Sequence, residues 1–568
     1  MAKLVDHPVL TYVRGLPAYQ QLLEQLREGG FKDQERFGLG LPRSSRLAVL
    51  AGLHVDLQVP VVLLTNRADR ALELYDELSF WLPEGNNLYF PEPNPLFYEN
   101  LPWSQSTRRE RLHVLTELAK YLLPGAEPSA APPVIIAPIR AVMTRTVPRR
   151  DFLRASQRLS LGDQRDLQEL ARSWVGLGYQ YSNIVVQPGQ FSRRGGILDI
   201  WSPAEEMPVR IEFFGNEIDT LKHFDPSTQR TVNALEKTFI FPASEALPMA
   251  AEKKGLLTEG LSEFEIPQLY DFPSSLMDYL PSQTLILLDG EEFVIAAIND
   301  IEEEAVARFQ SLVEQKALPE DFPLPYITWS EIEDSFTHHQ VLELGHTNAF
   351  GLRPLAAAFD PGPRFAGRLK EFQAHLQELE HKGEPWIVVS RQAARLRQLW
   401  QENNPELNTE TAEALFVEGS LSGGWELTLA NGLRHHLLTD SEIFGWGRPQ
   451  VRRRPPVVSE APELVFADLK PGDWVVHVDH GIGQFIGLHR TNLEGSQREY
   501  LTIQYKDNDV LYVPIHQADR LTRYIGPDDQ NPVISRLGGT EWNQTKQKVN
   551  QAVQAVAKDL LELYAKRQ

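Results

Sequence analysis

The chain has 568 residues, of which 42% are hydrophobic and 23% charged, a composition typical of a globular protein with several domains. Its formal net charge of -21 argues against broad nonspecific binding to nucleic acid, which needs many cationic contacts to phosphate. The absence of cysteine excludes disulfides and thiolate metal sites. No apolar run reaches the roughly eighteen residues of a membrane span, so we expect a cytoplasmic protein.

The first 148 residues have the pattern of an α/β domain. Helical periodicity occurs in residues 47–53 and 68–82. Uninterrupted apolar runs at residues 59–65 and 133–137 predict strands buried on both faces. We therefore expect a parallel sheet covered by helices.

A candidate nucleotide site lies at residues 40–47, GLPRSSRL, just before the first of these helices. A phosphate-binding loop needs a second glycine for close backbone approach, a lysine for the phosphates and a Ser or Thr hydroxyl for magnesium. After Gly40, these three places hold Ser45, Arg46 and Leu47. We interpret the segment as a degenerate phosphate loop, and the alternative is that it never was one. Both interpretations predict no ATP hydrolysis here.

Residues 149–239 predict a unit of antiparallel strands. A helix is expected over residues 167–178 and a first strand over residues 181–186. Alternating aliphatic residues then predict strands at 190–199, 209–214 and 217–224, with a Gly-Asn turn before the last. This spacing is typical of hairpins.

Three side chains of this unit form a candidate partner-binding patch. Arg194 and Arg210 offer guanidinium groups beside the aromatic ring of Phe214, a combination that suits protein recognition. Composition alone favours another interpretation, in which both arginines are solvated and Phe214 belongs to the core.

Residues 240–346 are expected to complete the first α/β body, with a strand at 284–288 and a helix at 293–312. Acidic residues follow this strand, and a second acidic run lies in the helix. Without a working phosphate loop, we interpret them as a solvated face rather than as acid catalysts or magnesium ligands. These residues are Asp289, Glu291, Glu292 and Glu302 to Glu304.

Residues 347–455 predict a smaller α/β unit. Its expected elements are helices at 365–381 and 391–402 and strands at 386–390 and 436–439. A basic, proline-rich stretch containing Arg452, Arg453 and Arg454 ends the unit. We interpret this stretch as a solvated linker, with contact to DNA or to a partner as the alternative.

Short strands predict a small β-barrel in residues 474–514. Polar and apolar residues alternate in residues 474–478, 499–504 and 510–513, with turn glycines between them and a turn at 506–509. His477, Asp479 and His480 suggest a metal site, but no fourth ligand has useful spacing, so we favour ordinary turn residues.

The last predicted element is a helix at residues 540–566. An apolar stripe recurs along it at steps of 7, 4, 3, 4 and 3 residues, so one face must pack on something. The stripe consists of Trp542, Val549, Val553, Val556, Leu560 and Leu563.

Two stretches resemble known families. The motifs HVDHGIG, REYLTIQY and LYVP resemble the RNA polymerase-interacting module shared by CarD-type transcription regulators and the bacterial transcription-repair coupling factors of the Mfd family. The motifs FSRRGGILDIWSP, RIEFFGNEID and FDPSTQRT resemble the damage-recognition module that the Mfd family shares with UvrB and that docks on UvrA. CarD-type regulators lack the second module and UvrB has an intact phosphate loop, so the resemblance to the Mfd family covers nearly the whole chain.

The resemblance implies partners and site residues. It assigns UvrA contacts to Arg194, Arg210 and Phe214. It assigns contacts to the RNA polymerase β subunit to a loop comprising Arg490, Thr491, Asn492 and Leu493, with Leu493 foremost, and to the adjoining strand. ATP and Mg²⁺ would belong to a translocase motor outside these residues, which would also make most of the DNA contacts. We expect a monomer with no catalytic residue, cofactor or metal of its own.

We thus expect an α/β multidomain chain that represents the non-motor portion of such a factor. The alternatives are a stand-alone CarD-like regulator and a UvrB-like ATPase. The expected division is a UvrB-like α/β body in two parts (1–148 and 240–346), a UvrA-interaction domain (149–239), a small α/β domain (347–455), a barrel-like RNA polymerase-interacting domain (456–535), and an amphipathic helix leading toward the motor (536–568).

Overall fold

The computed structural model describes residues 8–29, 37–83, 85–256, 260–345, 353–403, 415–429, 432–446, 469, 471–477, 479–493, 496–514, 520–524 and 534–537. The chain divides into two compact units, residues 1–449 and 450–568, and each is described by itself. The predicted helix at 540–566 and the arginines at 452–454 lie outside the described residues. No helix in the described ranges is long and apolar enough to cross a bilayer.

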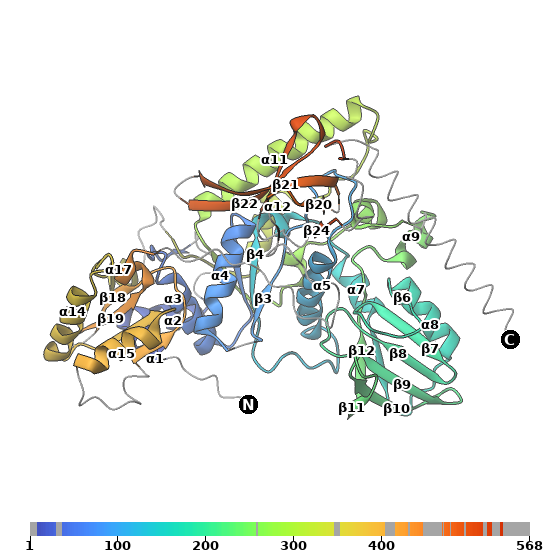
Figure 1. The fold of residues 1–568 in the computed structure, drawn as a ribbon. Helices are drawn as coiled ribbons and strands as arrows, with labels where there is room; N and C mark the ends of the chain where they lie inside the picture. The colour runs from blue at the N-terminus through green and yellow to red at the C-terminus, as the bar shows by residue number, and fades with distance from the viewer. Residues whose placement is uncertain are drawn as a thin grey trace. The chain divides into compact units, whose positions relative to one another are not determined.

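A six-stranded parallel sheet forms the centre of the first unit (Figure 1). The strand order is β1-β14-β13-β2-β4-β3, and every neighbouring pair runs parallel. Late strands β13 and β14 therefore join a sheet begun by early ones. The strands are β1 (Phe37–Gly38), β2 (Val61–Thr65), β3 (Asn87–Tyr89), β4 (Val134–Pro138), β13 (Leu285–Leu288) and β14 (Gln340–Glu343).

Both faces of this sheet are buried. Successive side chains of a strand point to opposite faces, so Val62 and Leu64 of β2 enter one core while Val61 and Leu63 enter another. Strands covered on both sides have uninterrupted apolar sequences, and the predicted buried strands are confirmed. The covering helices are α1 (Pro8–Arg14), α2 (Pro17–Arg27), α3 (Arg46–Leu57), α4 (Ala68–Trp81), α5 (Gln105–Lys120), α6 (Ile139–Met143), α7 (Arg149–Ala155), α11 (Glu291–Glu314) and α12 (Trp329–Phe336).

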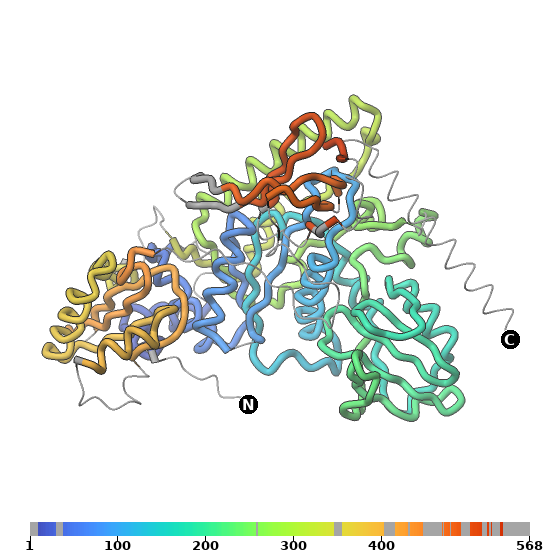
Figure 2. Tube along the Cα trace, in the orientation of Figure 1, coloured from blue at the N-terminus to red at the C-terminus, as the bar shows by residue number. Residues whose placement is uncertain are grey.

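An antiparallel insert leaves the body after α7 and returns through β12 (Figure 2). Its two ends are held together by pairing of β5 with β12, and its main sheet has the order β11-β10-β9-β8-β7-β6. Helix α8 places the buried Trp174 against Phe191 of this sheet. The elements are β5 (Gln157–Ser160), α8 (Leu167–Gly176), β6 (Gln180–Tyr181), β7 (Gln190–Arg194), β8 (Ile197–Ile200), β9 (Val209–Phe214), β10 (Glu217–Phe224), β11 (Thr231–Leu235) and β12 (Lys237–Ile240).

The expected strand at residues 181–186 is largely wrong, because β6 ends at Tyr181. The amide oxygen of Gln190 accepts hydrogen bonds from the backbone N–H groups of Val186 and Gln187, at 3.0 and 3.1 Å. Val185 meanwhile packs under the chain in a small cluster. These contacts turn the segment back into a loop before it can continue along β7.

A buried ion pair ties the returning chain to the body. Arg111 of α5 binds both carboxylate oxygens of Glu245, at 2.7 and 3.1 Å, and both side chains are almost fully buried. The guanidinium of Arg111 also lies over the rings of Phe90 and Trp103. After Glu245 the chain forms α9 (Pro248–Lys254), η1 (Glu263–Glu265), α10 (Ile266–Leu269) and η2 (Leu276–Tyr279).

The small α/β portion shares a core with the first body. Val389 and Leu437 of its sheet pack in the same cluster as α1 to α3, while Val388 and Leu438 face a core of their own. The strand order is β15-β18-β19-β16-β17, with β16 parallel to both neighbours. Its elements are α13 (Arg353–Ala356), β15 (Phe359–Asp360), α14 (Leu369–Lys382), β16 (Trp386–Ser390), α15 (Ala393–Asn403), β17 (Phe416–Glu418), β18 (Trp425–Thr428), β19 (Arg434–Thr439) and α17 (Asp440–Phe444).

The second unit contains a five-stranded antiparallel sheet of order β23-β22-β21-β20-β24. Its inner face buries Val475, Phe485 and Ile503 in one cluster. Within the described residues, β23 and β24 are the two ends of the sheet. The predicted turn at 506–509 is confirmed, and Asp507 and Asn508 take the positive φ angles that these residue types tolerate. The elements are β20 (Trp474–His477), β21 (Gly481–Leu493), β22 (Ser496–Gln504), η3 (Lys506–Asn508), β23 (Val510–Pro514) and β24 (Leu521–Arg523).

Candidate functional site

The candidate patch in the insert is organised around a buried carboxylate, Asp199. Strands β7, β8 and β9 are neighbours, and their register places Asp199 directly opposite Arg210. The Asp199 side chain is fully buried. Arg210 donates to it from Nε and Nη2 at 2.8 and 3.0 Å, and Arg194 donates at 2.6 Å. The Asp199 carboxylate thus binds the guanidinium groups of both arginines that the sequence predicted as site residues.

The two arginines differ in exposure. The Arg194 side chain is 47% exposed, whereas that of Arg210 is 13% exposed and lies over the ring of Phe224 at 4.6 Å. The hydrogen bond to Asp199 is the leading cause that raises the pKa of Arg210, which therefore stays charged. Arg194 has a solvent-facing surface for a partner, while Arg210 is mainly an internal ion-pair residue.

Phe214 lies at the end of β9, beside the β9–β10 turn, and is 83% exposed. Its neighbours Ile211 and Phe213 pack on the core, and Phe214 points to the opposite face. The interpretation that composition favoured is therefore wrong on two counts. Phe214 is not a core residue, and Arg210 is not solvated.

The phosphate-loop candidate has a strand–loop–helix context, since it lies between β1 and α3. Gly40 has φ of +64°, and Ser45 directly precedes α3. The hydroxyl of Ser45 donates to the carbonyl of Pro42 at 3.0 Å, and Leu47 is buried. Leu47 therefore offers no hydroxyl at the place where magnesium would be bound, and the Ser45 hydroxyl is bonded within the loop.

Arg46 fills the space beside this loop. Its guanidinium donates to Asp289 at 2.5 Å and to the Leu41 carbonyl at 3.2 Å. Arg70 of α4 binds the other oxygen of Asp289 at 2.8 Å. Although burial opposes ionisation, Arg70 and Arg46 lower the pKa of Asp289. Arg46, Arg70 and Asp289 are therefore paired with one another.

The expectation of a solvated acidic face needs one correction. Glu292 and Glu303 are exposed as expected, but Asp289 is buried because two arginines neutralise it. Glu343, at the end of β14, is also buried, and it accepts the backbone N–H of Glu291 at 2.7 Å. Burial is the main cause that raises the pKa of Glu343 to about 7.

The residues expected to contact polymerase belong to a strand and not to a loop. They form the end of β21, where their backbone pairs with the start of β22. The expectation of a loop was wrong because the hairpin continues past the sheet body. The register pairs Arg490 with Glu499, Thr491 with Arg498, Asn492 with Gln497 and Leu493 with Ser496.

This end of the hairpin extends beyond its neighbours. Strand β20 pairs with β21 only as far as Gln484, and β23 pairs with β22 only as far as Tyr500. Among the described ladders, the outer part of the hairpin has no further strand at either side. Unpaired edges of this kind are where a partner protein can add a strand.

The histidines considered as metal ligands belong to a packed turn. Asp479 is buried and ion-paired with Arg520, and its backbone N–H donates to Nδ1 of His477 at 3.1 Å. His477 also packs against the ring of His480. The described part of the chain contains no group of three His, Asp or Glu side chains placed to hold a metal ion.

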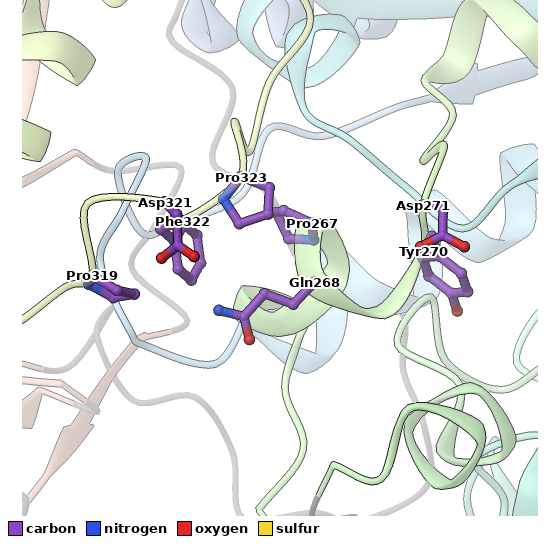
Figure 3. A pocket seen from close by; sticks show the side chains of 8 residues that line it. All are labelled: Pro267, Gln268, Tyr270, Asp271, Pro319, Asp321, Phe322 and Pro323. Atoms are coloured by element: carbon purple, nitrogen blue, oxygen red, sulfur yellow. The ribbon is translucent and has the colours of Figure 1, made fainter.

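A surface pocket of about 420 Å³ lies between α10 and the segment 319–323 (Figure 3). Gln268 projects between Phe322 and the far wall, where Asp271 lies beside Tyr270. None of the eight described lining residues is basic. The pocket therefore lacks the cationic groups that a nucleotide phosphate needs.

Sequence comparisons assign both candidate surfaces to known domain types. A family model described as "UvrB interaction domain" matches residues 158–245, and one described as "CarD-like/TRCF RID domain" matches residues 469–525. The first range contains Asp199 and its arginines, and the second contains the extended hairpin. Asp199 was not predicted as a site residue, although its place between Leu198 and Ile200 in a buried strand was a signal.

The chain is similar over nearly its whole length to proteins named transcription-repair-coupling factor. It is 26% identical to that of Bacillus subtilis (strain 168) and 25% identical to that of Staphylococcus haemolyticus (strain JCSC1435), each over 99% of the chain. It is also 25% identical to that of Staphylococcus aureus (strain Mu50 / ATCC 700699) over 93% of the chain. The chain spans about half the length of these relatives, 51%, 51% and 48% respectively.

Proposed function

We propose that the chain is the docking portion of a transcription-coupled nucleotide-excision repair factor. In this function, the hairpin of β21 and β22 binds the β subunit of a stalled RNA polymerase, and the insert binds UvrA. The observation that carries the proposal is the presence of both domain types in one chain. A stand-alone CarD-like regulator would not need the insert.

The UvrA surface would consist of Phe214 with the exposed edge of Arg194. A largely exposed aromatic ring beside a guanidinium is the kind of group that dominates binding energy at protein interfaces. Arg210 would act mainly by fixing Asp199 and, through it, Arg194. This assigns the three predicted residues two different roles.

The polymerase surface would consist of Arg490, Thr491, Asn492 and Leu493. Their backbone belongs to the part of the hairpin that extends beyond β20 and β23, which suits strand addition by a partner. A substitution of Leu493 by arginine would place a charge within that contact.

ATP chemistry would lie outside these residues. The pairing of Arg46 with Asp289 supports a site that needs no nucleotide, which disfavours a UvrB-like ATPase. We infer that ATP and Mg²⁺ act in a separate motor portion, that the chain has no cofactor of its own, and that it works as a cytoplasmic monomer. The motor would move on DNA and displace the polymerase.

Two binding titrations test the proposal. The chain is titrated with the isolated polymerase β lobe and, separately, with purified UvrA. We expect both to bind without ATP or any activating step. Leu493→Arg should abolish β-lobe binding only, and Phe214→Ala should weaken UvrA binding only. Failure of the unmodified chain to bind either protein would refute the corresponding half of the proposal.

A further inference from the structure

A second exposed apolar element lies on the insert, in the segment of residues 181–187 that begins at the last residue of β6. Tyr181 is 58% exposed, Ile184 is 47% exposed and Val186 is 45% exposed. Tyr181 packs against Phe191 on the core face of the sheet, so the patch on the outer face consists of Ile184 and Val186, which flank the buried Val185. The patch belongs to the loop that the sequence pattern had predicted as a strand.

Two sets of contacts hold the 181–187 segment in one conformation. Val185 is buried in a cluster with Trp201 and Phe224, which is separate from the main core. From the side, Gln190 accepts the N–H groups of Val186 and Gln187. The exposed side chains therefore belong to a preorganised loop, which loses little conformational entropy when a partner binds.

Gln229 connects this segment to the ion-paired arginine. The side-chain amide of Gln229 donates a hydrogen bond to the backbone carbonyl of Val185 at 3.1 Å. The backbone carbonyl of Gln229 accepts a hydrogen bond from Nη1 of Arg210, also at 3.1 Å. Gln229 has φ of +59°, a conformation that costs free energy for a residue with a Cβ. Such a conformation persists where the surrounding contacts require it, so Gln229 is a fixed link between the two features.

The segment and Phe214 lie on the same face of the sheet. Along β9, Val209, Ile211 and Phe213 pack against the main core, so Arg210 and Phe214 face the other way. The guanidinium of Arg210 contacts the ring of Phe224, which is covered by Val185. The part of the segment around Val185 therefore covers the same outer face near the start of β9, and Phe214 lies at the end of β9.

The length of β9 gives the distance between Phe214 and the segment near the start of the strand. Strand β9 has six residues. At about 3.4 Å per residue, its ends lie about 17 Å apart. A typical protein interface covers about 800 Å² on each partner, which is wide enough to include both ends of the strand.

We propose that the 181–187 segment is a second anchor for UvrA, in addition to Phe214. The inference rests on the proposed function of the insert and extends its contact surface across the outer face. Its support is continuity: both apolar features lie on the outer face, and Gln229 joins the segment to Arg210, Asp199 and Arg194. A partner that buries Phe214 and Arg194 at one end of the face would reach Ile184 and Val186 near the other end.

The test compares two valine substitutions in the full chain. Val186→Asp places a charge in the proposed anchor, whereas Val175→Asp places the same charge at a 51% exposed position on α8, which covers the core face of the sheet. We expect Val186→Asp and Ile184→Asp each to weaken UvrA binding about tenfold, which corresponds to about 1.4 kcal/mol. Val175→Asp should stay within about twofold of the unmodified chain.

Three outcomes are distinguishable, provided that near-UV circular dichroism shows the variants to be folded. Weakened binding by both loop variants, with normal binding by Val175→Asp, supports the second anchor. Normal binding by both loop variants, while Phe214→Ala still binds weakly, overturns the anchor and leaves the proposed function intact. Absence of UvrA binding by the unmodified chain overturns both.

Discussion

Replacing Arg210 by alanine should destabilise the insert locally as well as weaken UvrA binding. The change removes two hydrogen bonds from Asp199, whose side chain is fully buried, and the contact with the Phe224 ring. Removal of one partner from a buried ion pair typically costs about 3–5 kcal/mol. Arg194 still binds one oxygen of Asp199, so we expect the lower end, about 3 kcal/mol.

The matched change is Arg194→Ala. Arg194 is about half-exposed, and exposed ion pairs contribute about 0–1 kcal/mol, so this variant should keep nearly normal stability. If Arg194 contacts UvrA, its removal should still weaken binding. The two arginines share one carboxylate, and the account predicts different consequences for them.

Hydrogen exchange of the full chain, measured by mass spectrometry, resolves this difference. A cost of about 3 kcal/mol corresponds to roughly 100-fold faster exchange of the β8 and β9 amides in the Arg210→Ala variant, if exchange follows local opening. Arg194→Ala should change the rates of these amides by less than about fivefold. Equal exchange rates for the two variants would refute the reasoning that Arg210 is the internal member of the network.

Three further predictions concern the α/β body. Arg111→Ala leaves Glu245 buried without its partner, so thermal unfolding should begin roughly 10 °C lower, and an unchanged melting curve would contradict the importance of this pair. The Glu343 side chain is protonated in the folded state up to about pH 7, but it is ionised in the unfolded state above about pH 4.5. The free energy of unfolding should therefore fall as the pH rises from about 4.5 to about 7. Melting temperatures should fall less steeply over that range in Glu343→Gln, and an identical slope would show that another group is responsible. Titration with MgATP should give no saturable binding, because Arg46 and Asp289 neutralise each other, whereas binding that Arg46→Ala abolishes would restore the nucleotide-site interpretation.

Much of the architecture could be predicted from periodicity. The apolar runs of β2, β4 and β13 indicated strands covered on both faces, and the alternation along β9 and β10 indicated a hairpin. These patterns depend on how each strand is covered, which is recorded in its own sequence. Exact domain boundaries are not recorded in this way, and the proposed ones stay predictions.

The charged networks could not be predicted, because their partners are distant in sequence. Asp289 looked like part of an exposed acidic run, but its partners Arg46 and Arg70 precede it by 243 and 219 residues. Asp199 was overlooked for a similar reason. Its importance appears only when the register of three strands places Arg194 and Arg210 beside it.

The two wrong strand and loop assignments have local causes. In residues 181–186, aliphatic residues suggested a strand, but the side chain of Gln190 and the burial of Val185 turn the chain back. At Arg490 to Leu493, the family resemblance implied a loop, but cross-strand pairing continues to Leu493. In both places tertiary contacts outweigh local propensity.

The central claim is that one molecule holds RNA polymerase and UvrA at separate surfaces. The direct measurement is analytical ultracentrifugation of the chain with the polymerase β lobe and UvrA together. The account predicts one ternary complex, from which Leu493→Arg releases only the β lobe and Phe214→Ala releases only UvrA. Mutually exclusive binding of the two proteins, or loss of both through either substitution, would contradict it.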